Sequence, residues 1–412
     1  MQDLLYLVHR IPYPPNKGDK IRSYHLLKYL SAHFRVHLGC FIDDAGDRQY
    51  IPKLAAMCAS TCFIDHHMLG ARLRSLGGLF SGTAMSVAYY RDATLQAWVR
   101  QHLASGKFGH ALAFSGPMAQ YLQPPPGSAK LRRVIDFVDV DSEKWCQFAL
   151  TKWWPLAQLY RHEGRQLLEY ERTVAQQFDA ATFVSRAEAA LFQQRAPHLA
   201  RAPEFFSNGV DAAFFSPEQA HANPYPDGAR VLVFTGAMDY WPNIDAVSWF
   251  AAQVLPALRA QFPRLCLYIV GTRPAAAVKA LAQLPGVCVT GAVPDIRPYL
   301  AHASLAVAPL RFARGIQNKV LEAMAMEKTV VASPQALEGI SAVPGLELVL
   351  ADGADAFIGQ LARLLQAGSE HGIGAAARKR VLQDYCWEKN LESVGALLGL
   401  QQQLVPLREQ RA

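Results

Sequence analysis

The stretch PLRFARGIQNKVLEAMAMEKTVVAS, residues 309–333, shows most clearly how this chain is organised. An apolar segment ends at Pro309, a short loop follows, and Val320, Leu321 and Met324 then recur at helical spacing. The stretch closes on KTVVAS, a β-branched run that is typical of a buried strand. Because strand, helix and strand follow one another, the stretch predicts a unit of a parallel α/β sheet.

The same alternation continues in both directions along the chain. We expect strands at 4–8, 34–42, 110–114, 132–137 and 180–185 in the first half, and at 231–236, 265–271, 286–291, 304–310, 328–333 and 346–350 in the second. Between the two sets, residues 207–230 are rich in Pro, Ala, Asn and Gly and contain no periodic segment. The sequence therefore predicts two doubly wound α/β domains. The first comprises residues 1–206 with a return helix at about 385–412, and the second comprises residues 207–384.

Composition narrows the class of protein. Of the 412 residues, 51% are hydrophobic and 18% are charged, which is typical of a well-buried globular protein and argues against disorder. No run of about 18 uncharged apolar residues occurs, so we expect no membrane-spanning helix. The start of the chain does not read as a signal peptide, and we expect a cytoplasmic protein.

The net charge of +7 lies in the first half, where residues 1–205 hold 24 Lys and Arg against 17 Asp and Glu. A basic half suits anionic lipid head groups or a phosphate-bearing acceptor, and ordinary solubilising charge is the alternative. We find no helix-turn-helix, zinc-finger or aromatic RNA-binding signature, and therefore expect no nucleic-acid partner.

The seven cysteines are odd in number, which favours free thiols over a disulfide framework. Cys58 and Cys62 are followed by His66 and His67, a pattern that raises zinc as an alternative. No second pair of ligands with the usual spacing lies nearby, so we predict no metal site.

The loop and helix after Pro309 are suited to a nucleoside diphosphate. We expect Gly315 to open the helix, where free N–H groups and the positive end of the helix dipole attract phosphate. Lys319 and Arg311 are candidates to neutralise the phosphate oxygens. Glu322, two turns into the expected helix, is a candidate acceptor for ribose hydroxyls, and surface pairing with Lys319 is the alternative.

Two segments of the first half are further candidates. HRIPYPPNKGDKIRSYHLLKYL, residues 9–30, places Gly18 in a basic loop before a helix, which suits an anion, although solvated charge near a turn is commonplace. VIDFVDVDSEKW, residues 134–145, ends a buried strand with Asp139 and Asp141. Either carboxylate is placed to orient an acceptor hydroxyl or to act as a base, and helix capping is the alternative.

These motifs resemble a known family. Glu322-Ala323-Met324-Ala325 and the following strand are similar to the nucleotide-binding motif of GT-B-fold glycosyltransferases of family 4, the group 1 transferases. The family pattern is a Glu, seven residues, and Glu-Ala-Met-Ala. Where the family places its first Glu, which contacts the donor sugar, this chain has Arg314. The resemblance therefore implies that the sugar contact comes from elsewhere or that the donor differs.

Other segments extend the resemblance over the whole chain. FTGAMDYWPNIDAVSWF, residues 234–250, resembles the family segment whose loop, here from Gly236, lies over the diphosphate. The Arg and Lys usual in that loop are missing, so the resemblance assigns the phosphate to Lys319, Arg273 or Arg311. SNGVD at 207–211 resembles the family linker. Together with YPPNKGDKIRSYH and DFVDVDSEKW, it resembles the sugar transferases associated with PEP-CTERM/exosortase systems.

The resemblance implies a GT-B architecture, in which two Rossmann-like doubly wound domains face a cleft. It implies a glycosyltransferase of the hexosyltransferase type in bacterial exopolysaccharide or surface-glycan assembly, retaining in stereochemistry and without cofactor or metal. The partners would be a nucleotide-diphosphate sugar donor and a glycan or polyprenyl-diphosphate-linked acceptor. A nucleotide-sugar epimerase on the same fold and a catalytically silent nucleotide-sugar-binding module are the alternatives.

The segment LTKWWPLAQLYRHEGRQLLEYER, residues 150–172, suggests contact with a membrane surface. It mixes Trp153 and Trp154 with Arg161 and Arg165, as segments at a bilayer surface do. We therefore consider peripheral contact with an anionic membrane on the inner face of the plasma membrane, and a helix pair lining the cleft is the alternative.

Overall fold

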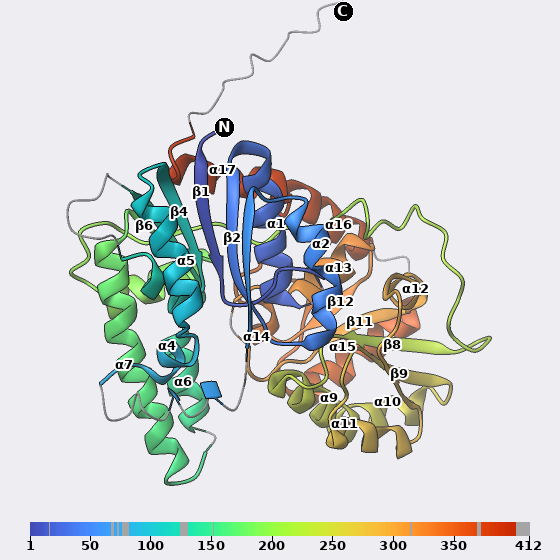
Figure 1. Ribbon diagram of the computed structural model, residues 1–412. Helices are drawn as coiled ribbons and strands as arrows, with labels where there is room; N and C mark the ends of the chain where they lie inside the picture. The colour runs from blue at the N-terminus through green and yellow to red at the C-terminus, as the bar shows by residue number, and fades with distance from the viewer. Residues whose placement is uncertain are drawn as a thin grey trace, which may run out of the picture.

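Two parallel β-sheets organise the chain, one in each half of the sequence (Figure 1). The computed structural model describes residues 1–15, 17–66, 70–71, 74–75, 82–123, 131–150, 152–313, 315–368 and 372–400. The first sheet has seven strands in the order β3-β2-β1-β4-β5-β6-β7 and the second has six in the order β10-β9-β8-β11-β12-β13. Each sheet grows outward in one direction and then in the other from its central strands, which is the doubly wound order. The predicted α/β fold class is confirmed.

The strands of the first sheet are β1 (Asp3–Val8), β2 (Arg35–Ile42), β3 (Ser60–Asp65), β4 (Phe108–Phe114), β5 (Arg132–Val138), β6 (Ala180–Phe183) and β7 (Glu204–Phe205). The strands of the second are β8 (Arg230–Thr235), β9 (Leu265–Val270), β10 (Val287–Gly291), β11 (Leu305–Ala308), β12 (Val330–Ala332) and β13 (Val349–Leu350).

The helices and 3-10 turns of the first half are α1 (Gly18–His33), η1 (Ala45–Tyr50), α2 (Ile51–Ala55), α4 (Met85–Tyr89), α5 (Ala93–Ala104), η2 (Gly116–Tyr121), α6 (Asp141–Leu150), α7 (Leu156–Gln177) and α8 (Arg186–Arg195). Those of the second half are α9 (Trp241–Gln253), α10 (Leu255–Gln261), α11 (Ala276–Ala280), η3 (Leu281–Gln283), α12 (Arg297–His302), α13 (Asn318–Ala325), α14 (Pro334–Leu337), α15 (Gly353–Ala367), α16 (Ile373–Asp384) and α17 (Trp387–Leu397).

The first sheet is covered on both faces, and β1 shows how. Its alternate residues Leu5 and Leu7 belong to one buried cluster, whereas Leu4, Tyr6 and Val8 belong to another. Successive side chains of a strand point to opposite faces, so a strand that is apolar throughout requires a cover on each side. The unbroken apolar run at the start of the chain therefore encodes a central strand.

The sequence did not predict β3 and β7, and it predicted a strand at 346–350 where β13 covers only Val349–Leu350. β3 reads STCFID and is only partly buried along its length, so it lacks the continuous apolar run that marked the other strands. β7 and β13 have two residues each. Short edge strands carry too little periodicity to be read from sequence.

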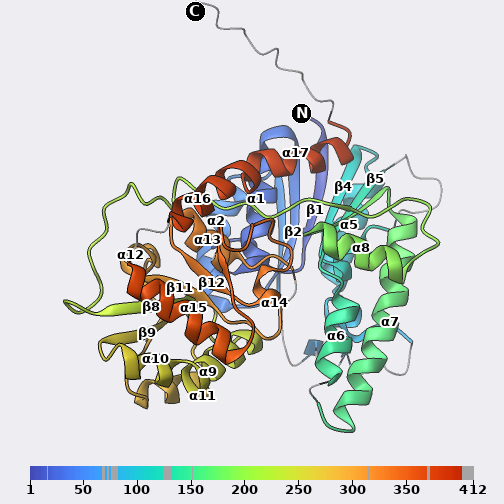
Figure 2. The same cartoon turned by 180° about the vertical axis from the view of Figure 1, so that it is seen from behind.

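The chain crosses between its halves twice, and the two crossings lie side by side. α17 packs its buried residues Trp387 and Leu391 in the same cluster as Leu26 of α1, and Figure 2 shows α16 and α17 running from the second half to the first. A Cβ added to Gly209, in the SNGVD segment, would lie 2.6 Å from Trp387. Glycine at 209 is therefore required for the two crossings to touch. Residues 401–412 of the predicted return helix lie outside the described residues.

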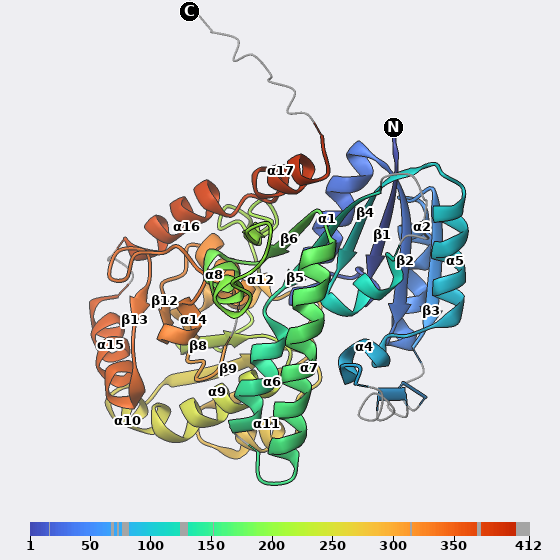
Figure 3. The same ribbon diagram turned by 90° about the vertical axis from the view of Figure 1, so that its left-hand side faces the viewer.

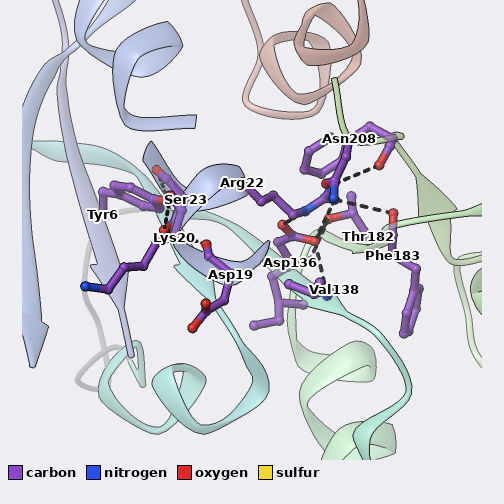
Figure 4. A network of polar contacts seen from close by, with 12 residues as sticks. Tyr6, Asp19, Lys20, Arg22, Ser23, Asp136, Val138, Thr182, Phe183 and Asn208 are labelled. Atoms are coloured by element: carbon purple, nitrogen blue, oxygen red, sulfur yellow. Dashed lines mark hydrogen bonds and ion pairs between the residues drawn. The ribbon is translucent and has the colours of Figure 1, made fainter. Parts of the chain in front are cut away.

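A buried ion pair holds the linker at residues 206–208, where the chain first passes from one half to the other. Arg22 of α1 and Asp136 of β5 are both fully buried, and Nε and Nη2 of Arg22 donate to the two carboxylate oxygens at 2.8 and 3.1 Å (Figure 4). Nη1 donates to the carbonyl oxygen of Phe206 at 3.0 Å and to Oδ1 of Asn208 at 2.9 Å. The guanidinium thus ties the helix, the sheet and the linker together.

Asn208 continues this network into the second half of the chain. Its Nδ2 donates to Oδ1 of Asn318, the first residue of α13, at 2.9 Å. One hydrogen-bonded path therefore runs from Asp136 through Arg22 and Asn208 to the start of α13. The predicted domain boundary near 206 lies beside this path, and the exact domain limits stay a prediction.

Replacing Asp136 by Ala is expected to lower the free energy of unfolding by about 3–5 kcal/mol, because the Arg22 charge is left buried without its partner. Urea unfolding followed by circular dichroism measures this. The matched control is Asp65→Ala, whose partner Arg48 is 57% exposed, and its cost is expected to stay within about 1 kcal/mol. Equal costs for the two variants would contradict the structural role given to Asp136.

Candidate functional site

Residues that follow strands of the two sheets contact each other, so the carboxyl edges of the sheets meet. A Cβ added to Gly18, which begins the helix after β1, would lie 3.9 Å from Nδ2 of Asn318 in the other half. A Cβ added to Gly315, after β11, would lie 2.2 Å from Oδ1 of Asp139, after β5. Open parallel sheets bind ligands at this edge. We therefore take the junction as the candidate site.

The predicted helix start at Gly315 is wrong, because α13 begins at Asn318. Gly315 has a φ of +64°, a left-handed conformation that favours glycine and does not continue into a right-handed helix. It therefore does not share a helix face with Lys319 and Glu322. Its observed contact is with Asp139 across the junction.

Two helix N-termini converge at the junction, since α1 begins at Gly18 and α13 at Asn318. The first N–H groups of a helix lack acceptors within the helix, and aligned peptide dipoles place partial positive charge there. Nδ2 of Asn318 is a further buried donor and has no hydrogen-bond partner among the described residues. The junction therefore offers donors and a positive potential for an anion such as phosphate.

Lys319 is the cation nearest to this point on α13. Its Nζ donates to Oδ1 of Asn243 and lies 4.2 Å from the centroid of the Phe234 ring. A Cβ added to Gly236 would lie 3.1 Å from Nζ, so the structure brings these two predicted donor-site residues together. Burial lowers the pKa of Lys319 to about 7, and the charge of Glu322 opposes this shift only in part.

Glu322 follows Lys319 by one turn of α13, but the two residues, both described, form no ion pair. Lys319 donates to Asn243 instead. Burial raises the pKa of Glu322 to about 7, while the charge of Lys319 acts in the opposite direction. Among the described residues, no side chain donates a hydrogen bond to its carboxylate.

The three predicted arginines differ in their surroundings. Arg311 is held on the surface of α9, where its Nε lies 2.9 Å from Oδ2 of Asp245. Arg273 pairs with Asp44, and so connects the loop after β9 with the loop after β2. Arg314 lies outside the described residues. Neither Arg311 nor Arg273 is therefore a free cation.

Both predicted catalytic carboxylates contact Lys144. Its Nζ lies 2.7 Å from Oδ2 of Asp139 and 2.9 Å from Oδ1 of Asp141. Burial alone would lower the pKa of Lys144, but the two carboxylates hold it well above its usual value. The Asp139 side chain is 13% exposed and that of Asp141 is 36% exposed. Oδ1 of Asp139, beside Gly315, is buried without a hydrogen-bond partner among the described residues.

A group of polar side chains after β1 and β2 was not predicted from the sequence. Oδ2 of Asp19 lies 3.4 Å from Nε2 of His9 and 2.6 Å from Nη1 of Arg10. Nε of Arg10 lies 2.8 Å from Oδ2 of Asp43. Burial would raise the pKa of Asp19, but the hydrogen bond from His9 and the charge of Arg10 outweigh it and hold that pKa well below its usual range.

His66, after β3, joins this group through Tyr90, because the rings of His9 and His66 both lie against Tyr90 at centroid distances of 5.7 and 5.2 Å. Nδ1 of His9, Oδ1 of Asp43 and Nε2 of His66 are buried and have no hydrogen-bond partner within the described part of the chain. The rule that singled out Asp139, a polar residue just after a buried strand, also applies to His9 and Asp43 and would have found them.

The residues of the possible zinc pattern that the structure describes, Cys58, Cys62 and His66, do not form a metal-binding cluster. Cys58 and Cys62 are free thiols, and His66 stacks on Tyr90. His67 lies outside the described residues. Within the described ranges, no group of three or more His, Cys, Asp and Glu side chains is arranged to hold a metal ion.

Comparison with known proteins identifies the second half of the chain. The sequence profile of the family described as "Glycosyl transferases group 1" matches residues 229–367. These residues form a group 1 glycosyltransferase domain. The matched segment contains Gly236, Lys319 and Glu322. No curated protein sequence matches the chain.

Solved structures with the GT-B fold match nearly the whole chain. Sucrose-phosphate synthase from Thermosynechococcus elongatus has a TM-score of 0.69 at 17% identity, over 96% of this chain and 98% of that one. WaaG, a glycosyltransferase involved in lipopolysaccharide biosynthesis, has 0.66 at 15% identity, over 96% and 100%. HepE from Anabaena, in complex with UDP and glucose, has 0.64 at 16% identity, over 97% and 99%. The group 1 domain on this fold makes the chain a glycosyltransferase.

Anion binding at the junction is expected to weaken as pH rises above about 7. A bound anion favours protonated Lys319, whose pKa is about 7 in the free protein. Above that pH binding must therefore take up a proton, and affinity falls by up to about tenfold per pH unit. Calorimetric titration with inorganic pyrophosphate between neutral and alkaline pH measures this. Lys319→Met should reduce the dependence to what Glu322 contributes, because the pKa of Glu322 is also about 7, and the exposed Lys279→Met should keep it in full. The same slope in both variants would exclude Lys319 as the group that titrates.

Proposed function

We propose that the chain transfers a sugar from a nucleoside-diphosphate sugar to a glycan or a polyprenyl-diphosphate-linked acceptor. The observation that carries the proposal is the convergence of the α1 and α13 N-termini at Gly18 and Asn318. A diphosphate at these helix starts would lie beside Lys319, and the ribose would lie one turn further on, at Glu322. The complex of HepE, which has the same fold, with UDP supports a nucleotide ligand for this chain.

Lys319 is better placed than the arginines to stabilise the leaving diphosphate. Arg273 and Arg311 each hold a carboxylate and would have to exchange it for phosphate. Lys319 holds a neutral amide, and Gly236 has no side chain that would crowd its Nζ. Two helix ends and a lysine supply positive potential where negative charge develops, which is electrostatic catalysis. We propose that the leaving group is stabilised in this way without a metal ion.

The acceptor is proposed to bind on the first-half side of the junction. Asp139 faces the Gly315 loop with an oxygen that has no hydrogen-bond partner among the described residues, and it is fixed by Lys144. A carboxylate in this position orients an acceptor hydroxyl toward the sugar. Asp141 shares Lys144 but is more exposed and lies in the first turn of α6, where an acidic residue also stabilises the helix.

The finer biological role rests on the sequence resemblance. Retention of anomeric configuration, bacterial exopolysaccharide assembly and the link to PEP-CTERM/exosortase systems are proposed on that ground. We also propose a cytoplasmic reaction beside the plasma membrane, on the ground of the expected free cysteines and of residues 150–172, which mix Trp with Arg.

Two alternatives to a transferase, an epimerase and a silent binding module, can each be tested by experiment. The grouping of His9, Asp19 and Asp43 supplies a histidine and carboxylates such as an epimerase needs. Product analysis with a labelled nucleotide-sugar separates the two, because conversion without any acceptor would favour the epimerase. A silent binding module would bind the nucleotide-sugar and show no turnover with any acceptor.

A panel of nucleoside diphosphates and their sugars should contain one member that raises the thermal unfolding midpoint by several degrees, since saturating ligand stabilises by about 2.7 kcal/mol at a hundredfold excess over Kd. Lys319→Ala and Glu322→Ala should each weaken the binding of that ligand by about tenfold or more. Glu338→Ala, an exposed carboxylate of the same domain, serves as the control. Full affinity in both site variants would rule out the α13 site.

Asp139→Asn is expected to lower kcat by about a hundredfold while leaving the affinity for the nucleotide unchanged, because it acts on the acceptor side. Asp141→Asn should lower kcat by less than about threefold, since its side chain is more exposed than that of Asp139. Steady-state transfer assays and nucleotide titration of both variants decide this. A larger loss in Asp141→Asn would reverse the assignment.

A further inference from the structure

α6 and α7 form a hairpin that projects beside the junction (Figure 3). The two helices are closely packed, since a Cβ added to Gly164 would lie 2.7 Å from Sγ of Cys146 and 3.0 Å from the carbonyl oxygen of Ser142. Two buried carboxylates fix the hairpin. Oε2 and Oε1 of Glu163 accept from the backbone N–H groups that begin α4, at 2.7 and 2.9 Å, and Glu171 accepts from the hydroxyl of Ser142 at 2.6 Å. The body of the hairpin is therefore rigidly attached.

The tip of the hairpin, in contrast, exposes large apolar side chains. Leu150, Trp153 and Trp154 are 78%, 74% and 73% exposed, and Leu156 is 40% exposed. Apart from Met1, the first three are the most exposed large apolar side chains of the described residues. Single exposed apolar residues are ordinary, but four within seven positions on a projecting tip mark an interaction surface.

The charge around the tip selects the kind of partner. Lys152, Arg161 and Arg165 are exposed and form no ion pair with another described residue. No acidic residue occurs between Glu143 and Glu163. Trp side chains with a cationic surround match the interface of an anionic bilayer, where indole rings lie at head-group depth and Lys and Arg meet the phosphates.

We propose that the α6–α7 tip, defined as residues 150 and 152–156 with Arg161 and Arg165, docks on the surface of an anionic lipid bilayer. Among the described residues no helix is long and apolar enough to cross a membrane, and the tip binds at the interface without crossing it. α6 has ten residues, so at 1.5 Å per residue Asp141 lies about 15 Å from the tip. Docking therefore holds the junction close above the head groups, within reach of an acceptor anchored in the bilayer. This last consequence rests on the proposed function, whereas docking itself does not.

Flotation with vesicles of phosphatidylcholine, alone or with a quarter phosphatidylglycerol, tests the proposal on the full chain without substrates. We expect binding to the anionic vesicles at low salt, with a loss of about tenfold at high salt or on neutral vesicles. Trp153→Ser with Trp154→Ser, and Arg161→Glu with Arg165→Glu, should each reduce binding by about tenfold. Leu382→Ser, an exposed apolar residue of α16, is the control and should bind like the unaltered chain.

Trp153→Phe with Trp154→Phe distinguishes insertion from unfolding. It should keep vesicle binding, because the rings stay apolar, and should lose the blue shift of tryptophan fluorescence that the unaltered chain shows on anionic vesicles. No binding of the unaltered chain at low salt would overturn the proposal, as would unchanged binding after both serine replacements. Concentration-dependent dimerisation that the serine variant abolishes would assign the tip to a second copy of the chain. Nucleotide affinity is measured separately, so failure of docking and failure of the donor site are told apart.

Discussion

The ion pair between Arg22 and Asp136 fixes how the halves of this protein meet. Both side chains are fully buried, and the guanidinium satisfies a carboxylate, a backbone carbonyl and an amide at once. Burying two charges is costly, and such a pair adds little net stability compared with apolar residues of the same shape. The ion pair instead fixes the position of the linker, because only one position lets Asn208 accept from Nη1 of Arg22. Since Asn208 also holds Asn318, the start of α13 is positioned from the first sheet.

The contacts across the junction are unequal in strength. Beside the chain crossings lie the buried network and the stacking of His25 on Trp387 at 4.4 Å. On the side of β2 and β9, the contact is the ion pair of Arg273 with Asp44, whose side chains are 50% and 39% exposed. An exposed pair of this kind contributes about 0–1 kcal/mol. The halves are thus held firmly beside the linker, and the exposed ion pair at the distant loops adds little to this.

Much of the fold was readable because parallel strands buried on both faces are continuous apolar runs, such as Leu4–Val8. The site was readable in part, because strand ends and glycines before helices follow general rules that led to Gly18, Asp139 and Lys319. The start of α13 was misplaced because a sequence pattern does not reveal that Gly315 has a positive φ. Asn208, Asn243 and Asn318 were missed for another reason. A neutral amide carries no signal until the fold shows which donor and acceptor it joins.

Lys319 and Glu322 both titrate near neutral pH in the protein without ligand. Burial moves both pKa values to about 7 from opposite directions, so neither charge is firmly established near neutral pH. A salt bridge between them would remove this ambiguity, but Lys319 donates to Asn243 instead. In the proposed function, an anion at the helix starts would be the charged partner of Lys319, and ribose hydroxyl groups would donate to Glu322. A nucleoside diphosphate carries both kinds of group on one molecule, at a spacing that a single turn of α13 can span. The proposed ligand would therefore provide a partner for both of these buried residues at once.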